Sequence, residues 1–164
     1  MEYFDVLDNN RKSLGYTKKR GEKLEDNEYN MGIEIWIFND KKLLLTQRSI
    51  NKSHPLEWEV PGGCSQKGET SIDTLEREVK EEIGIEIDKE YELLGTELYK
   101  KQFVDMYKSN IKVDLSKVKL QNEEVNNIKF VTKEEFLEMA NNKKVVKSIC
   151  DRYNVIKDKL KKDW

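Results

Sequence analysis

The sequence has few of the residues that build disulfide frameworks or histidine-based metal sites. Its 164 residues include two cysteines, two prolines and a single histidine. Cys64 and Cys150 stand far apart, outside any short metal-binding spacing, and two lone thiols are typical of a reducing compartment. The pattern argues against a secreted domain held together by disulfides and predicts a cytoplasmic protein.

Long apolar runs are also missing. No stretch approaches the roughly 20 consecutive apolar residues of a membrane-spanning helix, and residues 1–5 lack the basic and apolar regions of a signal peptide. The charge is nearly balanced, with 30 lysines and arginines against 32 aspartates and glutamates and a net charge of −2. Neither a membrane nor a nucleic-acid polymer is therefore an expected partner, and any polyanion binding must be local.

What the first 60 residues do contain is a series of strand patterns. Residues 3–7 and 14–18 predict a hairpin, with a polar turn between them. Residues 31–38 are apolar and β-branched, which predicts a largely buried strand, and residues 43–47 supply its antiparallel partner. A short strand over residues 57–60 is expected to end at Pro61-Gly62-Gly63.

A helix is predicted over residues 71–83. Thr70 is a candidate N-cap with Asp73 three positions later, the spacing of a capping box. Gly84 follows the last helical residue and is a candidate C′ residue, which ends the helix. One apolar stripe at helical spacing completes the pattern: Ile72, Leu75, Val79 and Ile83. Such a stripe predicts that the helix packs on a sheet.

The second half mixes strand and helix patterns without strict alternation. Residues 91–108 predict one or two strands and residues 128–131 another. Residues 133–140 predict a helix capped by Thr132, and residues 145–160 a terminal amphipathic helix. The order favours an α+β fold with a mixed sheet flanked by helices over a doubly wound parallel sheet.

The chemical signal lies on the first predicted helix. Glu78, Glu81 and Glu82 are spaced i, i+3 and i+4, so they share one face beside the apolar stripe. Like charges at this spacing repel by a few tenths of a kcal/mol per pair (roughly 0.2–0.5), and a divalent cation such as Mg²⁺ would reverse that sign. In a chain with 38% charged residues, the trio alone is equally typical of a solvated acidic surface.

The residues around the trio are much more specific. Gly63 is followed after five residues by Glu69, and after seven more by Arg77-Glu78-Val79-Lys80-Glu81-Glu82-Ile83-Gly84-Ile85. This segment resembles the Nudix box, G-x5-E-x7-R-E-U-x-E-E-x-G-U with U apolar, at every fixed position. Residues 30–140 as a whole are similar to the Nudix hydrolase superfamily.

The resemblance implies a fold and a domain organisation. The expected fold is the Nudix fold, an α/β/α sandwich with a mixed sheet between helices. One domain would span residues 1–164, with residues 1–29 as an N-terminal hairpin and loop extension. Residues 30–140 would form the Nudix core, and residues 141–164 a C-terminal helix.

The resemblance also assigns roles within the box. The carbonyl of Gly62 and the carboxylates of Glu78 and Glu82 are the implied principal metal ligands, and Glu81 is a further ligand or a water-positioning base. Glu81 and Glu82 are both candidate catalytic residues. Four other positions of the box are expected to be structural: Gly63, Glu69, Arg77 and Gly84.

The implied activity is Mg²⁺-dependent hydrolysis of a diphosphate linkage, with Mn²⁺ as a possible substitute, in a nucleoside diphosphate derivative or related small molecule. Glu124 occupies the region where family members often place a further catalytic acid, and Arg48 the end of a strand where they often contact phosphate. Both residues have the alternative interpretation of ordinary surface charges. A homodimer is one expectation, because dimers are common among relatives.

Two alternative functions come from the same superfamily. The segments 2–8, 20–22, 35–39, 44–49 and 51–52 resemble the isopentenyl-diphosphate isomerase-like branch. Isomerases, however, carry a cysteine where this chain has Gly62 and a histidine where it has Cys64. A non-catalytic nucleotide sensor is the second alternative, and the complete set of acids argues against it. Which diphosphate is cleaved, by how many metal ions and with which general base stays open at this point.

Overall fold

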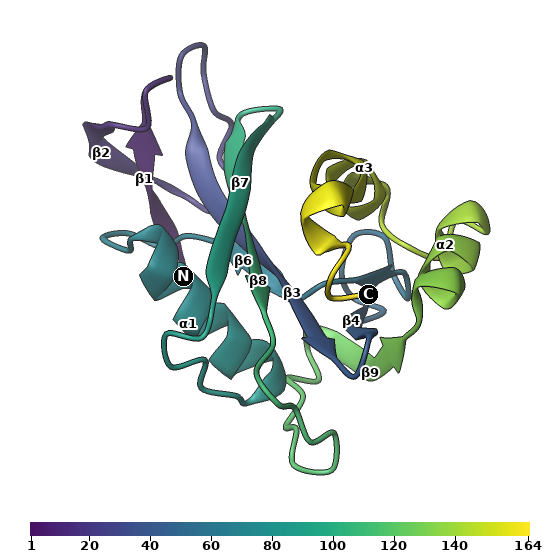
Figure 1. The fold of residues 1–164 in the computed structure, drawn as a ribbon. Helices are drawn as coiled ribbons and strands as arrows, with labels where there is room; N and C mark the ends of the chain where they lie inside the picture. Colours follow the sequence, from purple (N-terminus) through teal and green to yellow (C-terminus); the bar gives the residue numbers. More distant parts are fainter.

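The computed structural model describes residues 1–164 and contains one mixed sheet between layers of helices. Figure 1 shows α1 on one side of the strands and α2 and α3 on the other. The strands are β1 (Tyr3–Leu7), β2 (Ser13–Lys19), β3 (Asn30–Asn39), β4 (Lys42–Arg48), β5 (Trp58–Glu59), β6 (Gly62–Cys64), β7 (Glu92–Tyr99), β8 (Gln102–Ser109) and β9 (Val125–Val131). The helices are α1 (Ser71–Ile83), α2 (Lys133–Asn141), α3 (Lys147–Ile156) and a 3₁₀ turn, η1 (Lys157–Leu160).

Strand β3 is the centre of the seven-stranded sheet, whose main path is β5-β4-β3-β8-β7. One edge of β3 pairs in parallel with β8 along eight residues. Its other edge pairs antiparallel with β6 near its start and with β4 at its end, while β9 pairs with β4. The mixed sheet and its helical layers confirm the expected α+β architecture.

The alternation of side chains along β3 explains why both faces of the sheet are covered. Ile33, Ile35 and Ile37 pack in one core with the apolar stripe of α1. Trp36 and Phe38 pack in the other core, with α2, α3 and η1. Because both faces of β3 are buried, its sequence is an almost continuous apolar run rather than an alternating one.

Helix α1 has the predicted bounds and both predicted caps. Thr70 accepts a hydrogen bond from the Asp73 backbone, and Asp73 accepts one from the Thr70 backbone, which completes the capping box. Gly84 adopts the left-handed conformation with φ = 72° and closes the last turn. Leu75 and Val79 are fully buried, so burial of the stripe fixes the side of α1 that faces the sheet.

The C-terminal layer differs in detail from the prediction of one helix over 145–160. Val145 instead bridges Trp58, α3 begins at Lys147, and the chain tightens into η1 after Ile156. The core here is aromatic, as Phe136 makes edge contacts with Trp36 and Tyr153. None of these helices is long and apolar enough to cross a membrane.

The segment after Val60 contains a strand that the sequence does not predict. The sequence predicts that a strand ends at Pro61-Gly62-Gly63, yet residues Gly62–Cys64 form β6 and pair with β3. A Cβ on Gly62 would overlap the carbonyl oxygen of Ile33 and lie 2.9 Å from the Cα of Glu34. The glycine therefore permits the close approach of two backbones, as glycines within strands often do.

Candidate active site

The acidic residues of α1 border a cavity of about 370 Å³ that 26 residues line. It opens where β6 and β4 diverge along the same edge of β3, between the two helical layers. The lining includes Gly62, Gly63, Glu78 and Glu81 of the predicted box, while Glu82 lies beneath it with 1% of its surface exposed. The fold thus brings the box glycines against the box glutamates.

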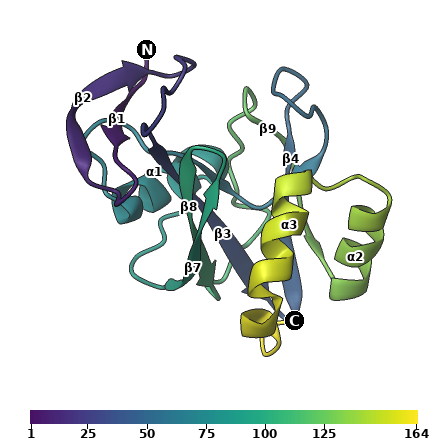
Figure 2. The same cartoon turned by 90° about the horizontal axis from the view of Figure 1, so that it is seen from above.

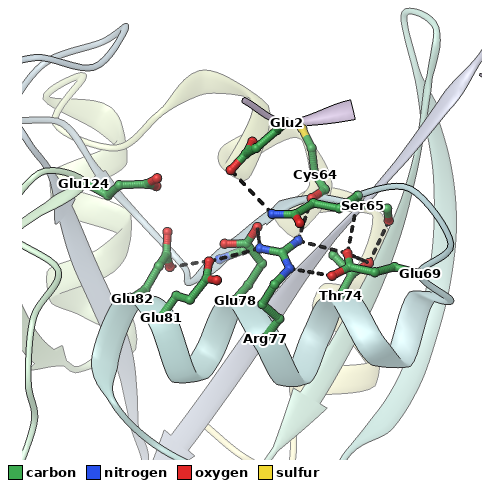
Figure 3. Close-up of polar contacts among 12 residues, drawn as sticks. Glu2, Cys64, Ser65, Glu69, Thr74, Arg77, Glu78, Glu81, Glu82 and Glu124 are labelled. Carbon is green, nitrogen blue, oxygen red and sulfur yellow. Dashed lines mark hydrogen bonds and ion pairs between the residues drawn. The ribbon is translucent and has the colours of Figure 1, made fainter. Parts of the chain in front are cut away.

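Close packing joins β6 to α1, as Figure 3 shows for the side chains of the helix. The backbone N–H of Gly62 donates a hydrogen bond to Oε2 of Glu82 at 3.2 Å. A Cβ on Gly63 would overlap the carboxyl group of Glu78 and lie 2.7 Å from its Oε2. The placement of Glu78 therefore requires glycine at position 63, as the β3 backbone does at position 62.

The three glutamates of the trio are not equivalent. Glu78 and Glu82 are buried, with 7% and 1% of their surfaces exposed, whereas the Glu81 side chain is 46% exposed. The three residues therefore do not share one environment: β6 packs against Glu78 and Glu82, whereas Glu81 lies at the rim of the cavity.

Burial makes ionisation of the inner pair unfavourable. It raises the pKa of Glu82 well above its ordinary value, and the carboxylates of Glu59 and Glu78 raise it further. Burial also raises the pKa of Glu78, against the opposing effect of Arg77. Two buried carboxylates carry a large free-energy cost when both are ionised, unless cations compensate their charge.

Arg77 compensates one side of this charge. Its Nε donates to Oε1 of Glu69 at 2.5 Å, its Nη1 to Oε1 of Glu78 at 2.8 Å, and its Nη2 to the Cys64 carbonyl at 2.9 Å. A longer contact of 3.1 Å joins it to Glu81. The three nitrogens tie the loop before α1 to the helix and hold Glu78 in place (Figure 3).

Glu82 has no such partner, since the only hydrogen bond to its carboxylate comes from the Gly62 backbone. The donor set of Glu78 and Glu82 with the carbonyl of Gly62 consists of hard oxygens, which Mg²⁺ and Mn²⁺ prefer. No three acidic, histidine or cysteine side chains already converge on one point. Mg²⁺ usually takes one or two carboxylates and completes its shell with waters and substrate phosphates, so these residues fit it.

Comparison with known proteins agrees with this geometry. A family model of the NUDIX domain matches residues 28–149. The chain belongs to the Nudix family. A Nudix hydrolase of Listeria monocytogenes is 42% identical over 143 residues, which cover 82% of each protein. Nudix hydrolase 3 of Arabidopsis thaliana is 33% identical over 152 residues, covering 82% of this chain and 20% of that protein.

The fold also matches a solved structure. DR0079 from Deinococcus radiodurans has a TM-score of 0.74 at 20% sequence identity, covering 88% of this chain and 92% of that one. The likeness confirms the Nudix fold. The family model and the relatives support hydrolase activity of the Nudix type, a family that generally uses divalent metal ions.

The two site residues predicted outside the Nudix box also line the cavity. Glu124 forms an ion pair there with Lys52, in which Lys52 Nζ and Glu124 Oε2 are 3.0 Å apart. Arg48 donates from Nη1 to both oxygens of Glu59 and from its other nitrogens to Ser53. Every nitrogen of Arg48 thus already has an acceptor within the chain.

Sequence reasoning missed several charged residues of the same cavity, among them Glu34, Glu59 and Arg152. Burial raises the pKa of Glu59, and the positive charges of Arg48 and Lys52 partly offset this rise. Glu34 and Arg152 form a buried ion pair, with Arg152 Nε and Glu34 Oε2 at 2.5 Å. A glutamate inside an otherwise apolar strand was the available signal for Glu34, since such a residue needs a partner when it is buried.

Proposed function

We propose that this Nudix protein hydrolyses a diphosphate linkage in a nucleoside diphosphate derivative or related small molecule, with Mg²⁺ or Mn²⁺ as cofactor. The observation that carries the proposal is the buried pair Glu78 and Glu82 packed against the backbone of Gly62 and Gly63. Only one of these carboxylates has a cationic partner within the chain.

The remaining charge supports a divalent ion. Glu82 receives one backbone N–H, and burial and the negative charges of Glu59 and Glu78 raise the pKa of its carboxyl group despite the opposing charge of Lys52. Ionising such a group without a bound cation costs several kcal/mol, on the order of what is found for broken buried ion pairs. A hard dication held by Glu78, Glu82 and the Gly62 carbonyl would remove that cost and leave coordination positions open toward the cavity.

The chain's own residues would then position and deprotonate the attacking water. A bound dication neutralises phosphate oxygens and acidifies water. Glu81 at the rim and Glu124 across the cavity are both exposed enough to accept the proton. Arg77 has a positioning role: Glu69 holds its guanidinium, which in turn holds Glu78 in place for the ion.

The backbone at Gly62 favours hydrolysis over isoprenoid isomerisation. The isomerase-like branch has a cysteine there, but in this chain a Cβ at position 62 would overlap the carbonyl oxygen of Ile33. Residue 64, where that branch has a histidine, is a cysteine whose Sγ accepts a hydrogen bond from Gln102 Nε2 at 3.1 Å. Neither acid–base group of an isomerase is therefore available at these positions.

A substrate panel tests the proposal. Purified protein is incubated in ¹⁸O-water with ADP-ribose, nucleotide sugars, dinucleoside polyphosphates or isopentenyl diphosphate, with Mg²⁺, with Mn²⁺ or with EDTA. We expect metal-dependent products with ¹⁸O in one phosphate, abolished by EDTA. Conversion of isopentenyl diphosphate to its dimethylallyl isomer without phosphate labelling, or no product from any compound, would overturn the proposal.

A further inference from the structure

The buried ion pair between Glu34 and Arg152 lies in the same cavity as the acidic pair, yet the Nudix box does not include it. Arg152 belongs to α3, which Figure 2 shows lying alongside β3, and its surface is 7% exposed. Its Nε donates to Oε2 of Glu34 at 2.5 Å, and its Nη2 makes a long contact of 3.4 Å with Ser148.

Glu34 is itself fixed. Its Oε1 accepts a hydrogen bond from Nε1 of Trp36 at 3.0 Å, so both carboxylate oxygens have donors. In the sheet, Glu34 lies opposite Gly62 on β6. The guanidinium of Arg152 is therefore held in a set position relative to the backbone that contacts Glu82.

The other partly buried cationic groups at this cavity are already committed, whereas Arg20, His54 and Lys100, which also line it, are exposed. All three nitrogens of Arg48 and of Arg77 have acceptors within the chain, and Lys52 pairs with Glu124. Nη1 of Arg152, in contrast, makes no hydrogen bond within the chain. It is not among the fully buried polar atoms that lack a partner. Arg152 lines the cavity together with Tyr99, whose ring centroid lies 5.8 Å from Arg152 Cζ, so Nη1 is the donor that remains for a ligand in the cavity.

We propose that Arg152 is a substrate-binding residue that donates through its Nη atoms to a phosphate oxygen of the diphosphate, and that Glu34 is the positioning residue that orients it. This inference rests on the proposed function. A guanidinium held by one edge keeps its other edge free for phosphate, where charge-assisted hydrogen bonds are short and directional.

A purely structural ion pair makes different predictions. Loss of Arg152 would then lower stability by leaving Glu34 buried without a partner, but would not change the affinity for a diphosphate. A substrate-binding arginine affects affinity and KM even where the protein stays folded. The conservative variant Arg152→Lys separates the two, because lysine keeps a positive charge for Glu34 but cannot present the planar fork.

Calorimetry with methylenediphosphonate, a non-hydrolysable diphosphate, and Mg²⁺ provides the test. We expect Arg152→Gln to weaken binding about 10- to 100-fold, with smaller losses for Arg152→Lys and Glu34→Gln. Lys147→Gln is the matched control, because Lys147 is an exposed residue of the same helix that pairs with Asp151. It should bind like the wild type, and melting curves identify any variant that does not fold.

The outcomes separate this inference from the proposed function. If folded Arg152→Lys and Arg152→Gln bind the diphosphonate like the wild type and keep its KM on a substrate from the panel, the pair is structural and the inference is wrong. Activity in the wild type would leave the proposed function standing in that case. If the wild type neither binds the diphosphonate nor cleaves any diphosphate, the proposed function fails and this inference with it.

Discussion

The carboxyl group of Glu78 occupies the space in which a side chain at Gly63 would begin. A Cβ at that position would lie 2.7 Å from Oε2 of Glu78 and closer still to the rest of the carboxyl group. One residue earlier, the Gly62 backbone donates to Glu82. The two glycines and the two buried glutamates therefore form one packed unit, and the geometry of each pair depends on the other.

The substitution Gly63→Ala should displace Glu78 without removing a functional group. We expect kcat/KM to fall about 100-fold, the size of effect that a misplacement of about 1 Å can have, while the melting curve stays cooperative. Gly95→Ala on β7 is the control, since a Cβ there would meet only Met106 Cε at 3.8 Å. Equal activity of Gly63→Ala and the wild type would contradict the packing argument.

The raised pKa of Glu82 predicts how stability depends on pH in the metal-free protein. The folded state holds this proton to higher pH than the unfolded state, whose glutamate pKa is about 4.3. The resulting stabilisation is complete below that pH and is lost as pH rises through the folded-state pKa. Urea unfolding in EDTA should thus show the wild type losing stability with rising pH.

The variant Glu82→Gln should lack this component of the pH dependence, because the amide does not ionise. Mg²⁺ should stabilise the wild type more at high pH than at low pH, since its ligands must be deprotonated. Parallel stability curves for the wild type and Glu82→Gln between pH 5 and 8 would show that Glu82 ionises freely, against this account.

Arg77 should act through the position of Glu78. Arg77→Lys keeps the charge but cannot serve Glu69, Glu78 and the Cys64 carbonyl together. We expect the Mg²⁺ concentration for half-maximal activity to rise about 10- to 100-fold, as for residues that orient metal ligands. Lys80→Gln, an exposed position on the same helix, should leave it unchanged; a similar rise there would point to a general charge effect.

The aromatic core beneath α3 should dominate stability. Phe136 is fully buried against Trp36, Tyr153 and Trp164. Phe136→Ala should lower the free energy of unfolding by about 3–5 kcal/mol, measured by urea denaturation. Its neighbour Leu137 is 39% exposed, so Leu137→Ala should cost much less. Equal losses for the two would mean that this core is not packed as described.

Features with a local signal were predictable from the sequence. The capping residues and apolar stripe gave the bounds of α1, and the spacing from Gly63 onward indicated the family. Strand β6 was not predictable, because its pairing with β3 depends on a long-range approach that two glycines permit. The burial of Glu78 and Glu82, but not Glu81, follows from that same pairing.

The cavity is harder still to read from sequence. Arg152 and Glu34 are 118 positions apart, and the sequence around either residue does not indicate that the two pair. Arg48 lies at the end of β4, where the sequence places it, but only the structure reveals that Glu59 and Ser53 use its donors. Which cation has donors to spare is a property of the assembled side chains.

The most direct test of the central claim is the rate of diphosphate cleavage by Glu82→Gln at saturating Mg²⁺, with a substrate from the panel. Glu76→Gln, an exposed position on α1, is the matched control. We predict that Glu82→Gln lowers kcat/KM about 100- to 1000-fold and that Glu76→Gln retains the wild-type rate. Cleavage by Glu82→Gln at the wild-type rate would contradict a metal-dependent site built on the buried pair.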